Sequence, residues 1–157
     1  MRRLWCAIAI ALLAGCGVAP SGVADGGRAP TGVAPGVTLY FVDANGDLRP
    51  QVRPTGHLGT ISEAVSLLLA GVGGSDLRTE ITANDETLVL VNVTSAVIEL
   101  RMQLGVRDVT PLGTDQIVCT ALGVHVQSGG SKSTRVRILF AQPSAGSDAL
   151  RSCPLIR

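Results

Sequence analysis

The sequence predicts an α+β fold, in which two helices pack on one mixed or antiparallel sheet as a two-layer domain with the order β-β-α-β-β-α-β. Three observations lead to this prediction. Several segments alternate apolar and polar residues, as half-buried strands do, and two others repeat apolar residues at helical spacing. Hydrophobic residues also make up 46% of the 157 residues, which is enough to build one core.

The domain is expected to begin with a hairpin and a helix. Residues 37–41 alternate between apolar and polar side chains, which indicates a strand. Asn45-Gly46 is a pair favoured in tight turns, and residues 48–52 then return as a second strand. The segment Thr60-Ile61-Ser62-Glu63 matches a capping box, so a helix is predicted to start there and to end at Gly71.

The second half of the domain is expected to hold three strands and a helix. Residues 88–93 form a short Val-rich run that predicts a buried strand. Residues 98–104 alternate strictly, which predicts a half-buried antiparallel strand. A second helix is predicted to begin at Thr110-Pro111 and to end before Gly123, and residues 135–140 alternate as the last strand. The inward side chains of the 98–104 strand are expected to be Ile98, Leu100, Met102 and Leu104.

The first fifteen residues resemble a lipoprotein signal peptide. A positive start is followed by an uncharged apolar run over 4–15, which is shorter than the ~20 residues that a membrane span needs. The run ends in Leu13-Ala14-Gly15-Cys16, which resembles the bacterial lipobox. The resemblance implies cleavage before Cys16, acylation of Cys16 and a lipid anchor on the extracytoplasmic face of the cell membrane. The alternative is an ordinary secretory cleavage after Gly17-Val18-Ala19.

The segment after Cys16 predicts a tether. Gly, Ala, Pro and Ser dominate residues 17–36, and no helix or strand period is present. Twenty such residues span about 25 Å on average and ~65 Å when fully stretched. The predicted organisation is therefore a signal peptide over 1–15, a lipidated Cys and tether over 16–36, and one domain over 37–157.

The charge balance excludes a nucleic-acid partner. The 13 Lys and Arg residues against 12 Asp and Glu give a net charge of +1, which leaves no excess to displace counterions from phosphates. Aromatic residues are only 3% of the chain, so few rings are available to stack on bases or sugars. Arg135 and Arg137 nevertheless project from one strand face, with Lys132 nearby. This patch either meets anionic lipid or an acidic partner, or is a solvated strand face.

The residues in this order resemble a GerMN domain, the module of the spore-germination protein GerM and of the actinobacterial lipoprotein LpqB. The similarity covers about residues 37–140, although Val72 and Thr82 stand where the family usually has proline. Its best single match is the segment Asp115-Gln116-Ile117-Val118-Cys119-Thr120. The resemblance implies an envelope-associated, non-catalytic domain, and it carries no catalytic residues over.

Two cysteines remain for the domain, because Cys6 lies in the signal run and Cys16 is expected to be acylated. Outside the cytoplasmic membrane, Cys119 and Cys153 are expected to form a disulfide that pins the tail to the second helix. The alternative is that Cys119 is a small buried core residue and that Cys153 lies in a frayed tail.

We predict no catalytic residues, no cofactor and no metal site. His57 and His125 have no His or Cys at metal-ligand spacing. The segment Asp43-Ala44-Asn45-Gly46-Asp47 has the oxygens of a calcium loop, but Leu48 and Pro54 occupy the EF-hand positions for Gly and Glu, so a hairpin turn is the preferred interpretation.

The predicted function is that of a membrane-anchored lipoprotein whose domain docks a partner protein of the cell envelope, through its sheet surface or by strand addition at an edge. The alternative is a binding protein for a small envelope ligand such as a cell-wall fragment, which requires a pocket with convergent polar groups. An envelope hydrolase is the weakest hypothesis, since a triple such as Ser62, His57 and Asp43 can be assembled on paper from any chain of this size.

Overall fold

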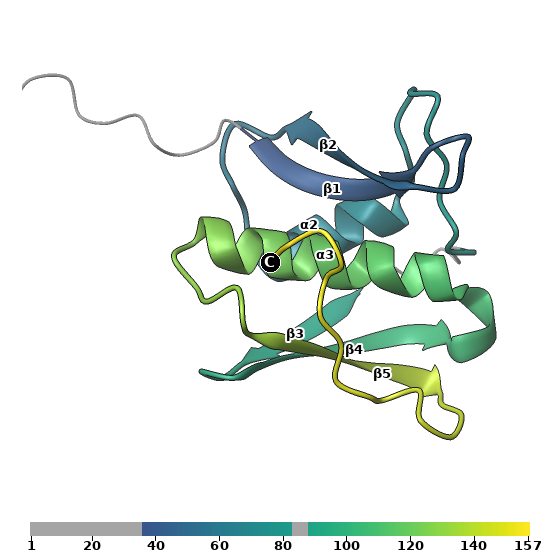
Figure 1. Cartoon of the computed structure of the whole chain (residues 1–157), viewed down its shortest axis with the longest axis vertical. Coiled ribbons are helices and arrows are strands. Elements are labelled where there is room, and N and C mark those ends of the chain that lie inside the picture. Colours follow the sequence, from purple (N-terminus) through teal and green to yellow (C-terminus); the bar gives the residue numbers. More distant parts are fainter. Residues whose placement is uncertain (1–35, 83–87) are drawn as a thin grey trace, which may run out of the picture. The chain divides into compact units, whose positions relative to one another are not determined.

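Two helices lie between two sheets in the computed structural model, which describes residues 36–82 and 88–157 (Figure 1). These residues belong to one unit that spans 32–157. The predicted signal peptide, Cys16 and the tether as far as residue 35 lie outside the described residues. The α+β class and the element order predicted from the sequence are confirmed.

The elements follow the predicted order with small shifts at their ends. The first sheet pairs β1 (Gly36–Val42) with β2 (Leu48–Pro54) in antiparallel fashion. The second has the order β3-β4-β5, with β3 (Val89–Val93) antiparallel and β5 (Arg135–Gln142) parallel to the central β4 (Val97–Gly105). The helices are α2 (Ile61–Leu69) and α3 (Pro111–Gln127), and a 3-10 turn, η1 (Val106–Asp108), follows β4.

The strands form two sheets rather than the predicted single sheet, so the domain has three layers and not two. The reason lies at the edge of β1 that faces away from β2. The backbone N–H of Tyr40 donates to Oγ1 of Thr120 at 3.1 Å, and Nε2 of Gln116 donates to the Tyr40 carbonyl at 2.9 Å. Because side chains of α3 already satisfy this backbone, β1 cannot pair there with a strand of the other sheet.

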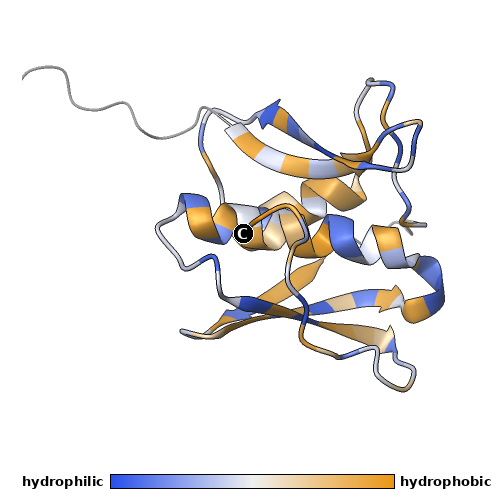
Figure 2. Cartoon of the chain, viewed as in Figure 1, coloured by the Kyte–Doolittle hydropathy of each residue, from blue (hydrophilic) through white to orange (hydrophobic). Residues whose placement is uncertain are grey.

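The core fills the two spaces between the helices and the sheets. Figure 2 shows hydrophobic residues along the helices and strands that border these spaces. The four inward positions predicted for β4 are confirmed, each with 2% or less of its surface exposed. The capping box that starts α2 is also confirmed, because Oγ1 of Thr60 accepts from the Glu63 N–H while the Glu63 carboxylate accepts from the Thr60 N–H.

Two predictions about individual elements are wrong. α3 does not end before Gly123 but continues to Gln127, since Gly123 sits inside the helix where the ring of Tyr40 packs against it. The positive φ that closes the helix is supplied by Gly129 instead, at 90°. The strand over 88–93 is not buried, because β3 is an edge strand with one uncovered face: Leu88 is 63% exposed and Leu90 is 56% exposed.

Candidate interaction surface

The outer edge of β2 is blocked against further pairing. Pro50 and Pro54 lack an N–H, and their register partners are Tyr40 and Gly36 on β1. The backbone of Tyr40 points away from β2 toward α3, so the opposite pair places Pro50 on the free side of β2. Proline on an edge strand is a common protection against the addition of another strand.

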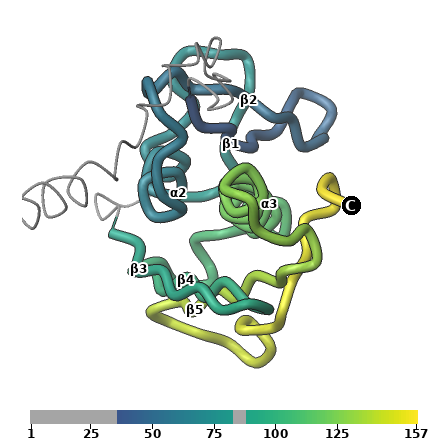
Figure 3. The backbone as a smooth tube through the Cα atoms, turned by 90° about the vertical axis from the view of Figure 1, so that its left-hand side faces the viewer, coloured from purple at the N-terminus to yellow at the C-terminus, as the bar shows by residue number. Residues whose placement is uncertain are grey.

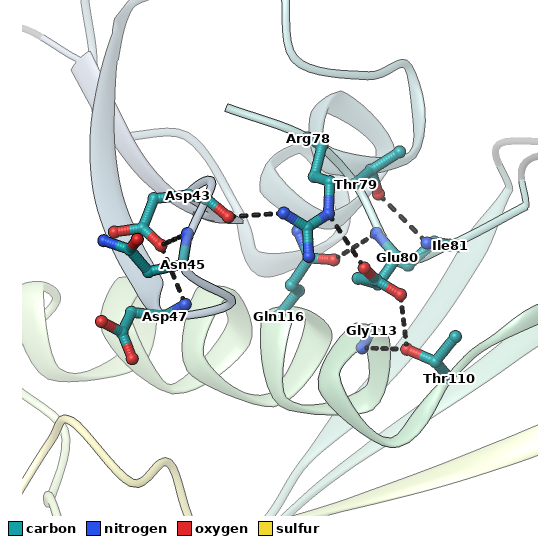
Figure 4. A network of polar contacts seen from close by, with 10 residues as sticks. All are labelled: Asp43, Asn45, Asp47, Arg78, Thr79, Glu80, Ile81, Thr110, Gly113 and Gln116. Carbon is teal, nitrogen blue, oxygen red and sulfur yellow. Dashed lines mark hydrogen bonds and ion pairs between the residues drawn. The ribbon is translucent and has the colours of Figure 1, made fainter. Parts of the chain in front are cut away.

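The opposite edge of this sheet, on β1, is occupied by a polar network (Figure 4). Beyond the contacts of Tyr40 with α3, Val42 exchanges two backbone hydrogen bonds with Arg78, at 2.9 and 2.8 Å. Glu80 continues the network: its carboxylate accepts from Nε of Arg78 at 3.1 Å, and its N–H donates to Oε1 of Gln116 at 2.8 Å. These charged and amide groups therefore hold the first sheet, the 78–81 segment and α3 together.

The calcium-loop oxygens of the hairpin are also used within the fold. The Asp43 carboxylate accepts from the N–H groups of Asn45 and Asp47 and pairs with Nε of Arg49 at 2.8 Å. This pairing with Arg49 lowers the pKa of Asp43 below its usual value. The segment is thus an Asx-stabilised hairpin turn, with Gly46 at a φ of 87°.

In the second sheet, the edge of β5 is partly closed by the tail. Val136 and Arg151 exchange two backbone hydrogen bonds, at 2.9 and 2.8 Å. The tail is itself held by the disulfide between Cys119 on α3 and Cys153, whose Cα atoms are 4.7 Å apart. The two cysteines expected to pair are therefore joined in the structure, and they fix the strand-like contact at Arg151.

The outer edge of β5 has no described backbone partner beyond Val136, and the edge of β3 is open as well. Its run Val89-Leu90-Val91-Asn92-Val93 contains no proline and no charge, and no described strand pairs with its outer side. One outer group is occupied, because Oγ of Ser62 donates to the Val89 carbonyl at 2.6 Å. Since alternate residues of an antiparallel strand direct their backbone groups to the same edge, Val91 and Val93 also direct theirs outward.

A cavity of about 480 Å³ lies beside this edge, along the outward side of α2. Ser62 lines the cavity and also contacts β3, so the two features adjoin, and Figure 3 shows α2 above β3 on the same flank. The lining is mainly apolar, with a few polar side chains. Its members are Val37, Thr55, His57, Leu58, Gly59, Ser62, Glu63, Ala64, Ser66, Leu67 and Ala70.

The face of the β3-β4-β5 sheet that points away from the helices, here the outer face, is uncovered in the described part of the chain (Figure 1). The strand register places Leu90, Arg101 and Leu139 in one row across it, and Asn92, Glu99 and Arg137 in the next. Three shallow hollows of about 280, 300 and 370 Å³ follow one another along the first row and end at the 143–148 loop.

The outer face has an excess of positive charge. Arg101, Arg135 and Arg137 lie on it, against the carboxylates of Glu99 on β4 and of Asp148 in the loop that lines the last hollow. Glu99 contacts Arg101 at 4.0 Å and Arg137 at 3.9 Å, which are the loosest ion pairs among those in the described residues. Nε of Arg137 is buried without a hydrogen-bond partner. The predicted Arg135 and Arg137 patch is thus present, whereas Nζ of Lys132 donates to the carbonyl of Arg157.

The structure does not assemble the serine, histidine and aspartate that the sequence offers as a triad. Ser62 and His57 line the same cavity, but the Ser62 hydroxyl is bonded to the Val89 carbonyl, and Asp43 is paired with Arg49 in the hairpin. His125 is within 3.1 Å of Oγ1 of Thr134, a contact that joins the end of α3 to the loop before β5.

Two features are absent from the described residues. No three His, Cys, Asp or Glu side chains in 36–82 and 88–157 are close enough to hold a metal ion. Over the same residues, no helix has the length and apolar character needed to cross a membrane.

Comparison with known proteins found no match to a protein-family model, to a curated protein or to a solved structure. The interaction surface must therefore be interpreted from its own residues. Sequence reasoning missed the open edge at β3, because an unbroken apolar run contains no polar positions to mark an uncovered face. The absence of proline and charge from 88–93, in contrast to β2, is the signal that could have indicated it.

Proposed function

We propose that this chain is a lipid-anchored envelope protein whose domain docks a partner protein by accepting one of its strands at the outer edge of β3. The observation that carries the proposal is the contrast among the sheet edges. β1 is satisfied by α3 and Arg78, β2 carries prolines, and β5 carries two arginines and is closed at Val136, while the uncharged β3 leaves the backbone of Val91 and Val93 free of described partners.

Strand addition suits this edge for a physical reason. Unpaired N–H and C=O groups bond an incoming strand regardless of its sequence, and the pockets beside the edge provide specificity. A partner strand added beside β3 would have apolar surface on both sides. The aliphatic side chains of β3 would provide one side, and the cavity next to Ser62 the other. Natural proteins usually block an uncharged edge of this kind, so leaving it open implies a use.

The setting in the cell envelope is supported by two independent features. The Leu13-Ala14-Gly15-Cys16 segment has the pattern of a lipobox, and the Cys119–Cys153 disulfide is of a kind that persists in oxidising compartments. The resemblance to GerMN domains agrees with this setting. It also agrees with a domain that acts through contacts and not through catalysis.

A proline at position 91 tests the docking edge directly. Val91→Pro removes an N–H that points outward, so the β3-β4 ladder is retained while a hydrogen bond to an added strand is lost. A photoreactive side chain at Asn92 in the full-length chain should cross-link to one partner protein in intact cells. We expect the Val91→Pro substitution to abolish that cross-link without lowering the melting temperature appreciably.

The matched control places the same photoreactive side chain at Val52, which is 61% exposed on the proline-bearing edge of β2. Equal cross-linking from positions 52 and 92, or a position-92 product that survives Val91→Pro, would contradict docking at β3. Protection of the Val93 amide from hydrogen exchange in the isolated complex would give the residue-level evidence.

A second candidate function rests on the cavity along α2. Its volume of about 480 Å³ and its mixed lining lie within the range of small-molecule sites, so a small envelope ligand such as a cell-wall fragment could bind there. If it does, a disaccharide-peptide wall fragment should raise the melting temperature. Ala70→Phe, which narrows the cavity from an exposed position, should remove that effect; no shift with the unmodified protein would reject this function.

A further inference from the structure

We infer that the outer face of the β3-β4-β5 sheet binds the anionic headgroups of the bilayer that carries the chain, so that the domain lies face-down on its own membrane. The inference rests on the lipid anchor of the proposed function but not on strand addition at β3. It assigns a ligand class, anionic phospholipid, to the outer face of the sheet, whereas docking at β3 uses the outward backbone groups of Val91 and Val93.

The first argument is the separation of charge. The mature chain after Cys16 has 11 basic and 12 acidic side chains, yet the strands of the outer face carry three Arg against one Glu, and Asp148 is the one further carboxylate that lines its hollows. Acidic side chains of the hairpin, such as Asp43 and Asp47, belong to the other sheet. A domain with no overall positive charge but with a positive face is oriented by an anionic surface rather than merely attracted to it.

The second argument is the unused bonding capacity of the arginines. A guanidinium has five N–H donors arranged to match phosphate oxygens, and the one carboxylate in these rows, Glu99, is shared by Arg101 and Arg137 at about the limit of ion-pair distance. Arg135 has its side chain exposed and has no described ion pair. The side chain of Arg137 is 40% exposed, although its Nε is buried and does not reach the surface. The face therefore offers phosphate donors that the fold itself does not consume.

The third argument is the shape and apolar content of the face. Leu90 and Leu139 flank Arg101 in one row, beside hollows that are shallow and not enclosed. Aliphatic side chains among arginines suit the interface between headgroups and acyl chains, where apolar groups insert and cations remain at the phosphates. A broad, shallow surface with charges on two strands fits a fluid layer of headgroups better than one rigid acidic peptide.

The tether is long enough for this orientation. The domain begins at Gly36 on β1, in the sheet on the opposite side of the helices from the outer face. Two layer spacings of ~10 Å each separate these sheets, so the anchor must lie at least about 20 Å from Gly36 when the outer face is on the membrane. A twenty-residue tether reaches about 25 Å on average, which meets this requirement without being stretched.

A single tryptophan can report the orientation. The chain contains one Trp, at position 5 in the predicted signal peptide, so a mature chain starting at Cys16 has none. Leu90→Trp places a reporter on the outer face, and Val52→Trp places its matched control on β2, at a similarly exposed position. With the disulfide intact, Cys16 is the free thiol and can be coupled to a maleimide lipid in vesicles.

We expect the Leu90→Trp emission to shift to the blue and to be quenched by brominated lipids on phosphatidylcholine vesicles that contain about one-third phosphatidylglycerol. The Val52→Trp emission should remain that of an exposed Trp. The Leu90→Trp signal should be lost in 1 M NaCl, where the Debye length is about 3 Å, and in the Arg101→Gln/Arg135→Gln variant. Arg49→Gln/Arg157→Gln, which removes the same charge elsewhere, should preserve it.

Other results would overturn the inference. Quenching that is equal at positions 90 and 52, or that is the same without phosphatidylglycerol, would show no anion-dependent orientation. A Leu90→Trp shift that grows with the surface density of the chain on pure phosphatidylcholine would identify a second copy as the occupant of the face. Because cross-linking at β3 is measured separately, failure here leaves the docking proposal intact, and failure there leaves this one intact.

Discussion

Gln116 on α3 donates a hydrogen bond from Nε2 to the backbone carbonyl of Tyr40 on β1, at 2.9 Å, and both residues are buried. The same side chain accepts from the Glu80 N–H at 2.8 Å. One amide therefore satisfies two segments that are far apart in the sequence. This role gives a physical reason for a fully buried glutamine at this position of α3.

Gln116→Leu is expected to lower the free energy of unfolding by about 2–4 kcal/mol, because it leaves the Tyr40 carbonyl and the Glu80 N–H without partners in or near the core. Urea denaturation of the mature chain measures this loss. Gln103→Leu, at an exposed position of β4, is the matched control and should change stability by no more than ~0.5 kcal/mol. Similar stabilities of the two variants would show that the buried amide contributes little.

Two glycines of α3 are expected to respond in opposite directions to alanine. A Cβ at Gly113 would overlap the carbonyl oxygen of Glu80, which is backbone and cannot easily move, so Gly113→Ala should destabilise by roughly 1–3 kcal/mol. A Cβ at Gly123 would lie 3.4 Å from the Tyr40 ring, an ordinary contact, so Gly123→Ala should be neutral or stabilise by up to ~1 kcal/mol. Thermal unfolding of both variants tests the pair, and the reverse order would be inconsistent with this packing.

Reduction of the Cys119–Cys153 disulfide should lower the free energy of unfolding by about 3–4 kcal/mol, the amount that loop-closure entropy gives for a separation of 34 residues. Denaturation with and without a reductant measures the difference. The Cys119→Ala/Cys153→Ala variant serves as the control, because it should be insensitive to the reductant. If reduction has no effect on the unmodified protein, the tail does not depend on the bond.

The hairpin turn should contribute to the acid sensitivity of the domain. Arg49 lowers the pKa of Asp43 in the folded state, so this contribution is present above the unfolded pKa of about 3.9 and is lost as the pH falls through the folded pKa. Asp43→Asn should therefore be less stable than the unmodified protein at neutral pH, and the difference should shrink below about pH 4. A difference that stays constant down to strongly acid pH would mean that the charge of Asp43 is not involved.

The sequence predicts local structure well at positions where the residue type has only one common structural role. The capping box at Thr60, the Asn45-Gly46 turn and the inward positions of β4 were all predictable, since each depends on neighbours within a few residues. The prediction that Gly123 ends the helix was wrong because glycine can either end a helix or make room for an aromatic ring inside one, and the sequence does not distinguish these two roles.

The division into two sheets and the site could not be predicted in this way. Both depend on contacts across 76 to 80 residues, such as those that Gln116 and Thr120 make with Tyr40. A period of apolar residues specifies which face of a strand is covered, but not which strand lies beside it. The exposure of Leu90 likewise follows from the outer face of the β3-β4-β5 sheet being uncovered, which no local pattern in 88–93 encodes.

The closure of β5 by Arg151 has a consequence for stoichiometry. A sheet that can grow at both edges allows each bound strand to be followed by another molecule, and such head-to-tail contacts produce open filaments. Here the tail occupies the β5 edge at Val136, and the disulfide at Cys153 secures it, so the proposed docking favours growth at the β3 side. Under the proposed docking, the domain is therefore expected to take one partner strand and to end the pairing there, without forming a fibre.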